Sequence, residues 1–169
     1  MDRSFAEPPW RIDRADELSW DGAADVIVVG FGGAGACAAI EAAEQGAEVI
    51  VFDRYGGGGA TERSGGVIYA GGTRFQREAG IDDTPEEMRK YLAHQLGIDP
   101  DDAALRAYCD GSPGDIDWLA RHGVPFGSTV YEPKADYPPD GSYLYYSGNE
   151  VHDAHIARAA PRGHPAPGS

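Results

Sequence analysis

The most informative part of the chain is DVIVVGFGGAGACAAIEAAEQGAEVIVFD, residues 25–53. A short β-branched run at 25–29 precedes a glycine cluster, an alanine-rich run of helix-forming residues at 34–45 and a second apolar run at 48–52. Strand, helix and strand in so few residues form a compact βαβ unit. The first run suits a strand buried on both faces of a parallel sheet. The fold class that follows is α/β, and the unit is the start of a Rossmann-like domain.

A glycine motif lies between the expected first strand and helix, since residues 30–35 match G-x-G-x-x-G. Gly30 makes the tight turn, Gly32 lets the backbone approach a pyrophosphate, and Gly35 lets the helix pack closely on the strand. The helix N-terminus offers N–H groups and a partial positive charge to the phosphates. Asp53 ends the second strand, where an acid accepts hydrogen bonds from an adenosine ribose. This order predicts a dinucleotide site rather than a purely structural turn, and the acid disfavours NADP.

Composition excludes several classes of partner. The 169 residues make one domain the default, and 14 Lys+Arg against 28 Asp+Glu give a net charge of −14, which disfavours nucleic acid and anionic membranes as partners. The two cysteines form no disulfide framework, and the first twenty residues lack the apolar core of a secretory signal. The longest uncharged run, 26–40, is too short and glycine-rich to span a bilayer. We expect a cytoplasmic protein without a membrane span.

The rest of the chain divides into segments of different amino-acid composition. Residues 1–22 read as a loose N-terminal arm, 56–74 as a glycine-rich loop, and 161–169 as a disordered, unpaired tail. Helix-start signals predict three short helices in series, which form a helical insertion. They run from Pro85, after the capping residue Thr84, to about Leu96, then over 99–108, and then over 112–121. Beyond them lies a tyrosine-rich segment with a hairpin-type turn at Asp140-Gly141.

The segment after Asp53 favours FAD over NAD, because it is a glycine-rich ribbon with few side chains, which can lie against a large planar ring. Residues 25–53, with Gly59-Ala60-Thr61 and Ser64-Gly65-Gly66, resemble the fumarate reductase/succinate dehydrogenase flavoprotein superfamily. The stretches 64–73, 145–150 and 161–164 most resemble its 3-ketosteroid Δ4-(5α)-dehydrogenase branch. The resemblance implies that residues 23–160 are the N-terminal part of an FAD-binding domain, which is incomplete here.

The same resemblance implies a set of residues that contact FAD. The glycine turn would face the pyrophosphate. The acid at the end of the second strand and the residue after it would face the adenosine end. The glycine-rich ribbon would line the pyrophosphate and the isoalloxazine ring. These residues are Gly30, Gly32, Gly33, Ala34, Gly35, Asp53, Arg54, Ala60, Thr61, Ser64, Gly65 and Gly66. No position matches a catalytic residue of the family, whose acid/base groups lie beyond position 169, and no metal is implied.

The function implied is FAD-dependent oxidation or reduction of a carbon–carbon bond next to a carbonyl. The partners implied are a small-molecule substrate, such as a steroid, and an external electron acceptor. One alternative is fumarate or succinate chemistry, although no arginine and histidine clamp for two carboxylates is recognisable. A non-catalytic nucleotide-binding module is the other alternative. We expect the chain alone to bind FAD weakly or to be only partly ordered, because the FAD sheet normally takes later strands.

Several other residues have ordinary structural interpretations. His152, His155 and His164 lack a metal-ligand set and are expected to be solvated. Cys37 is expected to be a small buried residue that packs on the sheet. Asp82-Asp83 reads as a solvated helix start. The tyrosines at 131–146 favour hairpin packing slightly over contact with a flat apolar substrate.

Overall fold

The computed structural model describes residues 11–166, and these form two compact units, one up to Thr61 and the other from Glu62. The first unit holds a short 3-10 helix, η1 (Ala15–Glu17), within the expected N-terminal arm, of which residues 1–10 lie outside the described part. A second 3-10 helix, η2 (Thr61–Arg63), begins at the end of the first unit.

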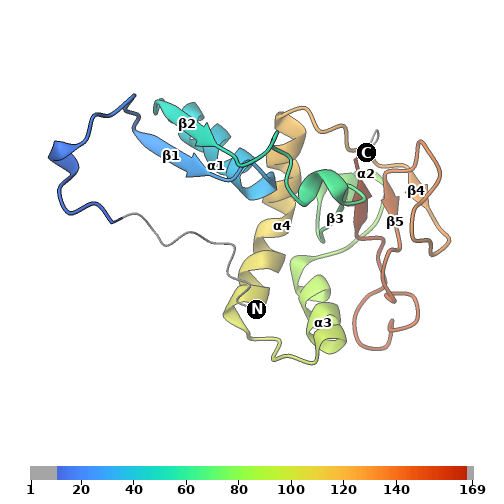
Figure 1. The fold of residues 1–169 in the computed structure, drawn as a ribbon. Helices are drawn as coiled ribbons and strands as arrows, with labels where there is room; N and C mark the ends of the chain where they lie inside the picture. Colours follow the sequence, from blue (N-terminus) through green and yellow to red (C-terminus); the bar gives the residue numbers. More distant parts are fainter. Residues whose placement is uncertain (1–10, 167–169) are drawn as a thin grey trace, which may run out of the picture. The chain divides into compact units, whose positions relative to one another are not determined.

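The expected βαβ unit is confirmed in the first unit (Figure 1). Strand β1 (Val26–Val29) leads through the glycine turn into α1 (Gly33–Glu44), and the chain returns in β2 (Val49–Phe52). The two strands are parallel, in a register that pairs the first residues of both strands and continues to their last. Gly46 has φ +88° just after the helix, as a glycine that ends a helix does.

Burial in this unit differs from the expectation. Val28 faces α1, but Ile27 and Val29 on the other face of β1 are 60% and 84% exposed, so burial on both faces is wrong for this chain. Cys37 is exposed as well, contrary to the expected packing on the sheet. The reason is that a single helix covers one face of two strands, which leaves no described residue of this unit buried.

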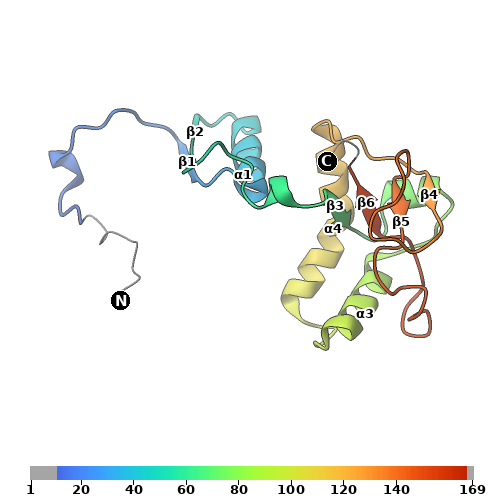
Figure 2. The same cartoon turned by 45° about the vertical axis from the view of Figure 1, so that its right-hand side comes forward.

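The second unit is built on a four-stranded sheet in the order β3-β6-β5-β4 (Figure 2). Its strands are β3 (Val67–Tyr69), β4 (Val130–Tyr131), β5 (Leu144–Tyr145) and β6 (Gly163–Pro165). β6 lies between β3 and β5 and is antiparallel to both, whereas β4 and β5 are parallel. The turn at Asp140-Gly141 forms, with φ +84° at the glycine, but the strands that flank it are parallel, so a hairpin is wrong.

The expectation of an unpaired tail is also wrong for residues 161–166. Strand β6 sits inside the sheet, and Arg162 and His164 are fully buried. The local sequence did not predict this strand, because prolines and glycines favour loops unless pairing with other strands overrides that preference. Similarly, β3 lies within the expected glycine-rich loop, and its β-branched pair Val67-Ile68 was a usable strand signal.

The helical part has fewer breaks than expected. Helix α3 (Pro85–Leu96) is confirmed, and Thr84 caps it by accepting from the Glu87 N–H at 3.2 Å. The next two expected helices are one helix, α4 (Ala103–Arg121), with Pro113 inside. Proline lacks the N–H that would bond the Cys109 carbonyl. The Ser112 hydroxyl donates to that carbonyl at 3.0 Å, which compensates for the missing donor and lets the helix continue.

A short helix that the sequence reading missed, α2 (Arg74–Glu78), precedes α3. Thr73 and Gln76 form a reciprocal capping box at its start, and the T-x-x-Q spacing was the available signal. One apolar cluster of the second unit joins α2, α4 and β5 through buried residues, with Phe75, Ile116 and Leu144 among them. A second cluster joins α3 and α4, so the core of the chain lies entirely in this unit.

A fully buried ion pair ties β6 to the loop before α3. Arg162 donates to both carboxylate oxygens of Asp83, at 2.8 and 2.9 Å. Asp83 also accepts from the Gln76 side-chain amide at 3.0 Å. Asp83 is therefore a buried structural acid and not the solvated residue that its place before a helix suggested.

Candidate cofactor site

The glycine turn has the geometry that a close strand-to-helix connection requires. Gly30 has φ +99°, in the left-handed region, and Gly32 is the N-cap of α1 in an extended conformation without a capping side chain. A Cβ on Gly35 would lie 1.9 Å from the Gly30 carbonyl oxygen, far inside contact distance. Only glycine fits there, and the result is a cradle of backbone N–H groups at a helix start that carries a partial positive charge. That cradle suits a pyrophosphate.

The glycine ribbon after β2 folds back onto this turn. The Gly58 N–H donates to the Phe31 carbonyl at 2.7 Å, and the Thr61 hydroxyl accepts from the Gly33 N–H at 3.1 Å. Ala60, which is exposed, precedes Thr61 in the same segment. The structure thus brings Thr61, with Ala60 next to it in the chain, to the helix N-terminus, and their contact with FAD stays a prediction.

Asp53 directly follows β2 and lies beside the glycine turn. One carboxylate oxygen accepts from the Phe31 N–H at 2.6 Å, and the other from the Tyr55 N–H at 2.7 Å. These backbone donors, chiefly Phe31, lower the pKa of Asp53, so its carboxyl group is ionised at neutral pH. The side chain is exposed, and each oxygen can accept further bonds from ribose hydroxyls.

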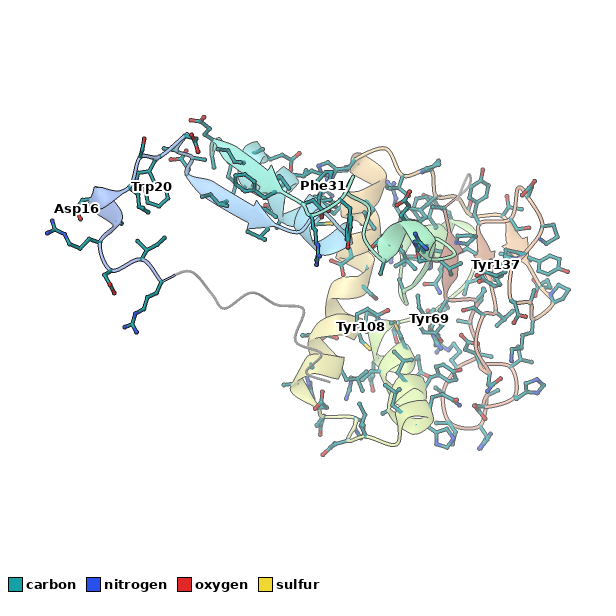
Figure 3. All side chains as sticks on the ribbon, in the orientation of Figure 1. Asp16, Trp20, Phe31, Tyr69, Tyr108 and Tyr137 are labelled. Atoms are coloured by element: carbon teal, nitrogen blue, oxygen red, sulfur yellow. The ribbon has the colours of Figure 1, made fainter. Side chains whose placement is uncertain are left out.

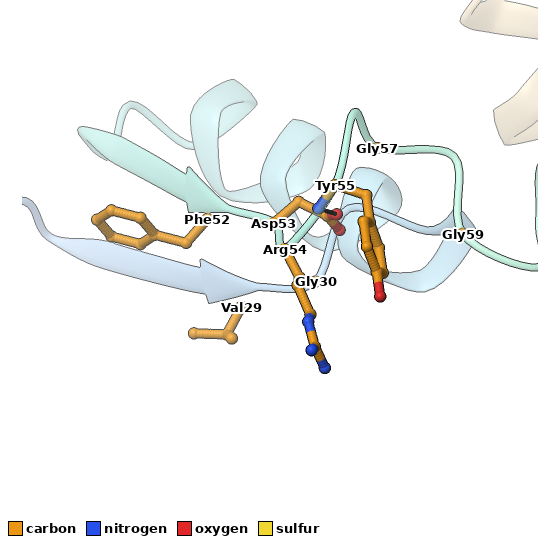
Figure 4. Close-up of a pocket in the computed structure, with 8 residues that line it drawn as sticks. All are labelled: Val29, Gly30, Phe52, Asp53, Arg54, Tyr55, Gly57 and Gly59. Carbon is orange, nitrogen blue, oxygen red and sulfur yellow. Dashed lines mark hydrogen bonds between the residues drawn. The ribbon is translucent and has the colours of Figure 1, made fainter. Parts of the chain in front are cut away.

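A cavity of about 470 Å³ opens at the carboxyl ends of the two parallel strands (Figure 4). In open α/β sheets this is where ligands bind. The Arg54 guanidinium lies 5.6 Å from the centre of the Tyr55 ring, a cation–π arrangement at the cavity wall. The lining residues are Val29, Gly30, Phe52, Asp53, Arg54, Tyr55, Gly57 and Gly59.

The sequence reading missed five of the lining residues as site residues, namely Val29, Phe52, Tyr55, Gly57 and Gly59. Gly57 and Gly59 have φ +89° and +57°, a conformation that side chains rarely adopt. Their place immediately after the acid of β2 was the available signal. Tyr55 is 79% exposed, so its ring face is accessible to a planar group such as adenine.

The remaining predicted residues belong to the second unit. The Ser64 hydroxyl accepts from the Gly66 N–H at 3.2 Å, and Gly66 has φ +64°. A Cβ on Gly65 would lie 2.4 Å from Cε1 of Tyr137. A side chain at position 65 would therefore have to displace the Tyr137 ring, a contact that the sequence did not reveal.

The histidines divide into two kinds. His152 and His155 are exposed, as expected, whereas His164 is buried between the Thr73 hydroxyl at 3.0 Å and the Arg162 carbonyl at 2.8 Å. Burial lowers the pKa of His164, so the ring is neutral and serves the core. Within residues 11–166, no group of three or more acidic, histidine or cysteine side chains could hold a metal ion. The same residues include no helix that is long and apolar enough to cross a bilayer.

The glycine cradle, the acid after β2 and the glycine ribbon define a dinucleotide site of the FAD type, and residues 25–164 match the FAD binding domain family. The chain belongs to this family. The close approach of helix to strand, which a Cβ at Gly35 would prevent, fits the cofactor from which the family takes its name.

Within the family, the chain is similar to ketosteroid dehydrogenases. It is 46% identical over 158 residues to the 3-oxo-5-alpha-steroid 4-dehydrogenase of Comamonas testosteroni, covering 90% of this chain and 30% of that protein. A 3-oxosteroid 1-dehydrogenase of Mycolicibacterium smegmatis is 37% identical over 101 residues, which cover 58% of this chain and 17% of that protein.

A solved structure agrees with these relatives. The 3-ketosteroid-delta4-(5alpha)-dehydrogenase of Rhodococcus jostii RHA1, in complex with 4-androstene-3,17-dione, superposes with a TM-score of 0.78 at 43% identity. The match covers 89% of this chain and 32% of that one. The chain therefore spans about a third of the length of the Comamonas and Rhodococcus proteins, and the α/β fold class and the resemblance to the Δ4-(5α) branch are confirmed.

Proposed function

We propose that this chain supplies the FAD-binding part of an oxidoreductase that acts on a carbon–carbon bond next to a carbonyl in a ketosteroid-like substrate. The observation that carries the cofactor assignment is the glycine turn, in which α1 starts close to the Gly30 carbonyl and has no capping side chain on its N-cap residue, Gly32. The substrate class rests on the similarity to the ketosteroid dehydrogenases and on the steroid bound in one of them.

Each part of the site has a role in this proposal. The backbone of residues 30–35, with Ala60 and Thr61, holds the pyrophosphate. Asp53 orients the ribose, and Arg54 and Tyr55 flank the adenine end of the cavity. Ser64, Gly65 and Gly66 line the flavin ring. When bound, FAD exchanges a hydride with the substrate at its flavin N5, and an external acceptor or donor completes the cycle.

The first test is a visible spectrum of the purified chain after it is mixed with FAD and desalted, with a titration of flavin fluorescence for weak binding. We expect flavin binding to the wild-type chain. Gly35→Ala should weaken it about tenfold or more, because relieving a Cβ-to-oxygen contact of 1.9 Å costs ~1–3 kcal/mol. Gly22→Ala is the matched control, since no atom lies within 4 Å of a Cβ at that position.

The second test separates the possible activities. Because the acid/base groups are expected beyond position 169, the readout is a shift of the bound flavin's absorption bands on ligand binding and not turnover. A 3-ketosteroid should shift these bands, and succinate should not. A shift with succinate alone would support the fumarate reductase/succinate dehydrogenase alternative. Flavin binding with no shift by either compound would favour a non-catalytic nucleotide-binding module. Equal flavin affinity of Gly35→Ala and wild type would contradict the assignment of the cofactor site.

A further inference from the structure

Phe31 is a large apolar side chain inside the glycine turn, and the site described above uses only its backbone groups. It occupies the first variable position of the G-x-G-x-x-G motif, for which the motif requires no particular residue. The side chain is labelled in Figure 3, and Phe31 is 42% exposed, so more than half of it is covered. This coverage stands out in a unit in which no described residue is buried.

The ring of Phe31 lies against the glycine ribbon that follows β2. A Cβ on Gly57 would lie 2.8 Å from Cδ1 of the ring and 3.6 Å from Cε1, so the ring edge rests on the Gly57 backbone. A Cβ on Gly59 would lie 3.1 Å from the Gly32 Cα. The ribbon therefore contacts both the Phe31 ring and the backbone of the turn, at a closeness that side chains at positions 57 and 59 would disturb.

The backbone of Phe31 connects the same segments. Its carbonyl accepts from the Gly58 N–H at 2.7 Å, and its N–H donates to the Asp53 carboxylate at 2.6 Å. The side chain and both backbone groups of one residue thus join the glycine turn to the ribbon and to the acid after β2.

The ribbon is costly to order without such contacts. Residues 56–59 are four consecutive glycines, and glycine loses more conformational freedom on folding than any other residue. Gly57 and Gly59 line the cavity at the ends of the strands, whereas Phe31 does not. A ligand that meets a preformed wall binds more tightly than one that must order the wall itself. A contact that holds the ribbon therefore raises affinity without touching the ligand.

We propose that the side chain of Phe31 is a positioning residue of the nucleotide site, whose ring holds the ribbon 56–59 against the glycine turn before the cofactor binds. The inference rests on the proposed function, in which the turn and the ribbon receive the adenosine diphosphate half of FAD. The ring acts through Gly57 and not by contact with the ligand. Its loss should therefore weaken FAD and adenosine diphosphate by the same factor, because both meet the same wall.

The first measurement is amide hydrogen exchange of the ¹⁵N-labelled chain without nucleotide. Phe31→Ala should speed exchange of the Gly58 N–H about tenfold, because the ring no longer holds the ribbon. Exchange at Gly46, whose N–H bonds the Ala43 carbonyl at the end of α1, should not change. If Gly46 exchange also rises, the first unit has unfolded, and Phe31→Leu takes the place of Phe31→Ala with a smaller expected rise at Gly58 alone.

The second measurement is the dissociation constant of FAD and of adenosine diphosphate. Phe31→Ala should raise both about tenfold, since it removes a phenylalanine that is more than half covered. Phe31→Tyr keeps the ring and should stay within about twofold of wild type. Ile27→Ala is the matched control and should do the same, because Ile27 is a 60% exposed residue of the same unit that does not line the cavity.

The outcomes separate this inference from the cofactor assignment. Equal Gly58 exchange in Phe31→Ala and wild type, or equal nucleotide affinity, would overturn the inference even if FAD binds. Faster Gly58 exchange in Phe31→Ala, in a chain that binds neither FAD nor adenosine diphosphate, would reject the cofactor assignment and leave the hold of the ring on the ribbon supported.

Discussion

The two units differ in how they are stabilised. In the first, no described residue is buried, and the glycine turn is held by backbone hydrogen bonds and by Asp53. The second contains the apolar clusters and a buried Arg162–Asp83 pair. Groups at a ligand site must stay accessible, whereas a core must exclude water, and here the two requirements fall on separate stretches of chain. Substitutions in the second unit should therefore change global stability, and those in the first should change local order and ligand affinity.

The largest expected effect is that of Arg162→Ala. Removing the guanidinium leaves Asp83 buried without its counter-charge, which should cost ~3–5 kcal/mol of the free energy of unfolding of the second unit. Urea denaturation followed by Trp118 fluorescence measures it. Arg74→Ala is the control, because its ion pair with Asp117 is half exposed and is worth at most about 1 kcal/mol. Equal losses in the two variants would show that the buried pair has no special role.

If Arg162→Ala does not fold, a double variant provides a second measurement of what the buried pair contributes to stability. Arg162→Met with Asp83→Asn removes both charges, so neither is left unpaired. It should recover part of the lost stability. A double variant less stable than either single variant would contradict this account.

A smaller effect is expected for Ser112→Ala in α4. The hydroxyl donates to the Cys109 carbonyl and accepts from the Gly71 N–H at 3.3 Å, so its loss leaves buried groups unpaired and should cost ~1–3 kcal/mol. Pro113→Ala restores the missing helical N–H, and Ser112→Ala should cost less in that background. A double-mutant cycle by thermal denaturation gives the coupling, and a coupling of zero would refute the compensation of Pro113 by Ser112.

The smallest effect should be confined to the first unit and appear as a pH dependence. The Phe31 and Tyr55 N–H groups lower the pKa of Asp53 below the ordinary value of about 3.9. Their contribution is therefore complete above that value and is lost as the pH falls through the lower folded pKa. The Phe31 and Tyr55 amide signals should titrate below pH ~3.9 and lose this step in Asp53→Asn. A midpoint at or above that value would show that the turn does not depend on the ionised acid.

The sequence predicted the first unit well because its signals are local. The βαβ order and the place of Asp53 after the second strand follow from neighbouring residues. The exposed face of β1 and the exposure of Cys37 were misjudged. The second unit depends on contacts between distant residues. No residue near Asp83 predicts its pairing with Arg162, which lies 79 residues later. No residue near Gly65 predicts its contact with Tyr137. Pro113 ends a helix by local rules, and only the bond from Ser112 to Cys109 explains why α4 continues.

The place of β6 in its sheet also sets the order in which the chain can fold during synthesis. Strand β6 is synthesised after the other described strands but lies between β3 and β5, and the partner of Asp83, Arg162, directly precedes it. The βαβ segment is complete by Phe52, whereas the second sheet cannot close until Pro165 has emerged. A nascent chain that has reached β5 exposes the edges of both β3 and β5, which are open to pairing with other chains until β6 arrives.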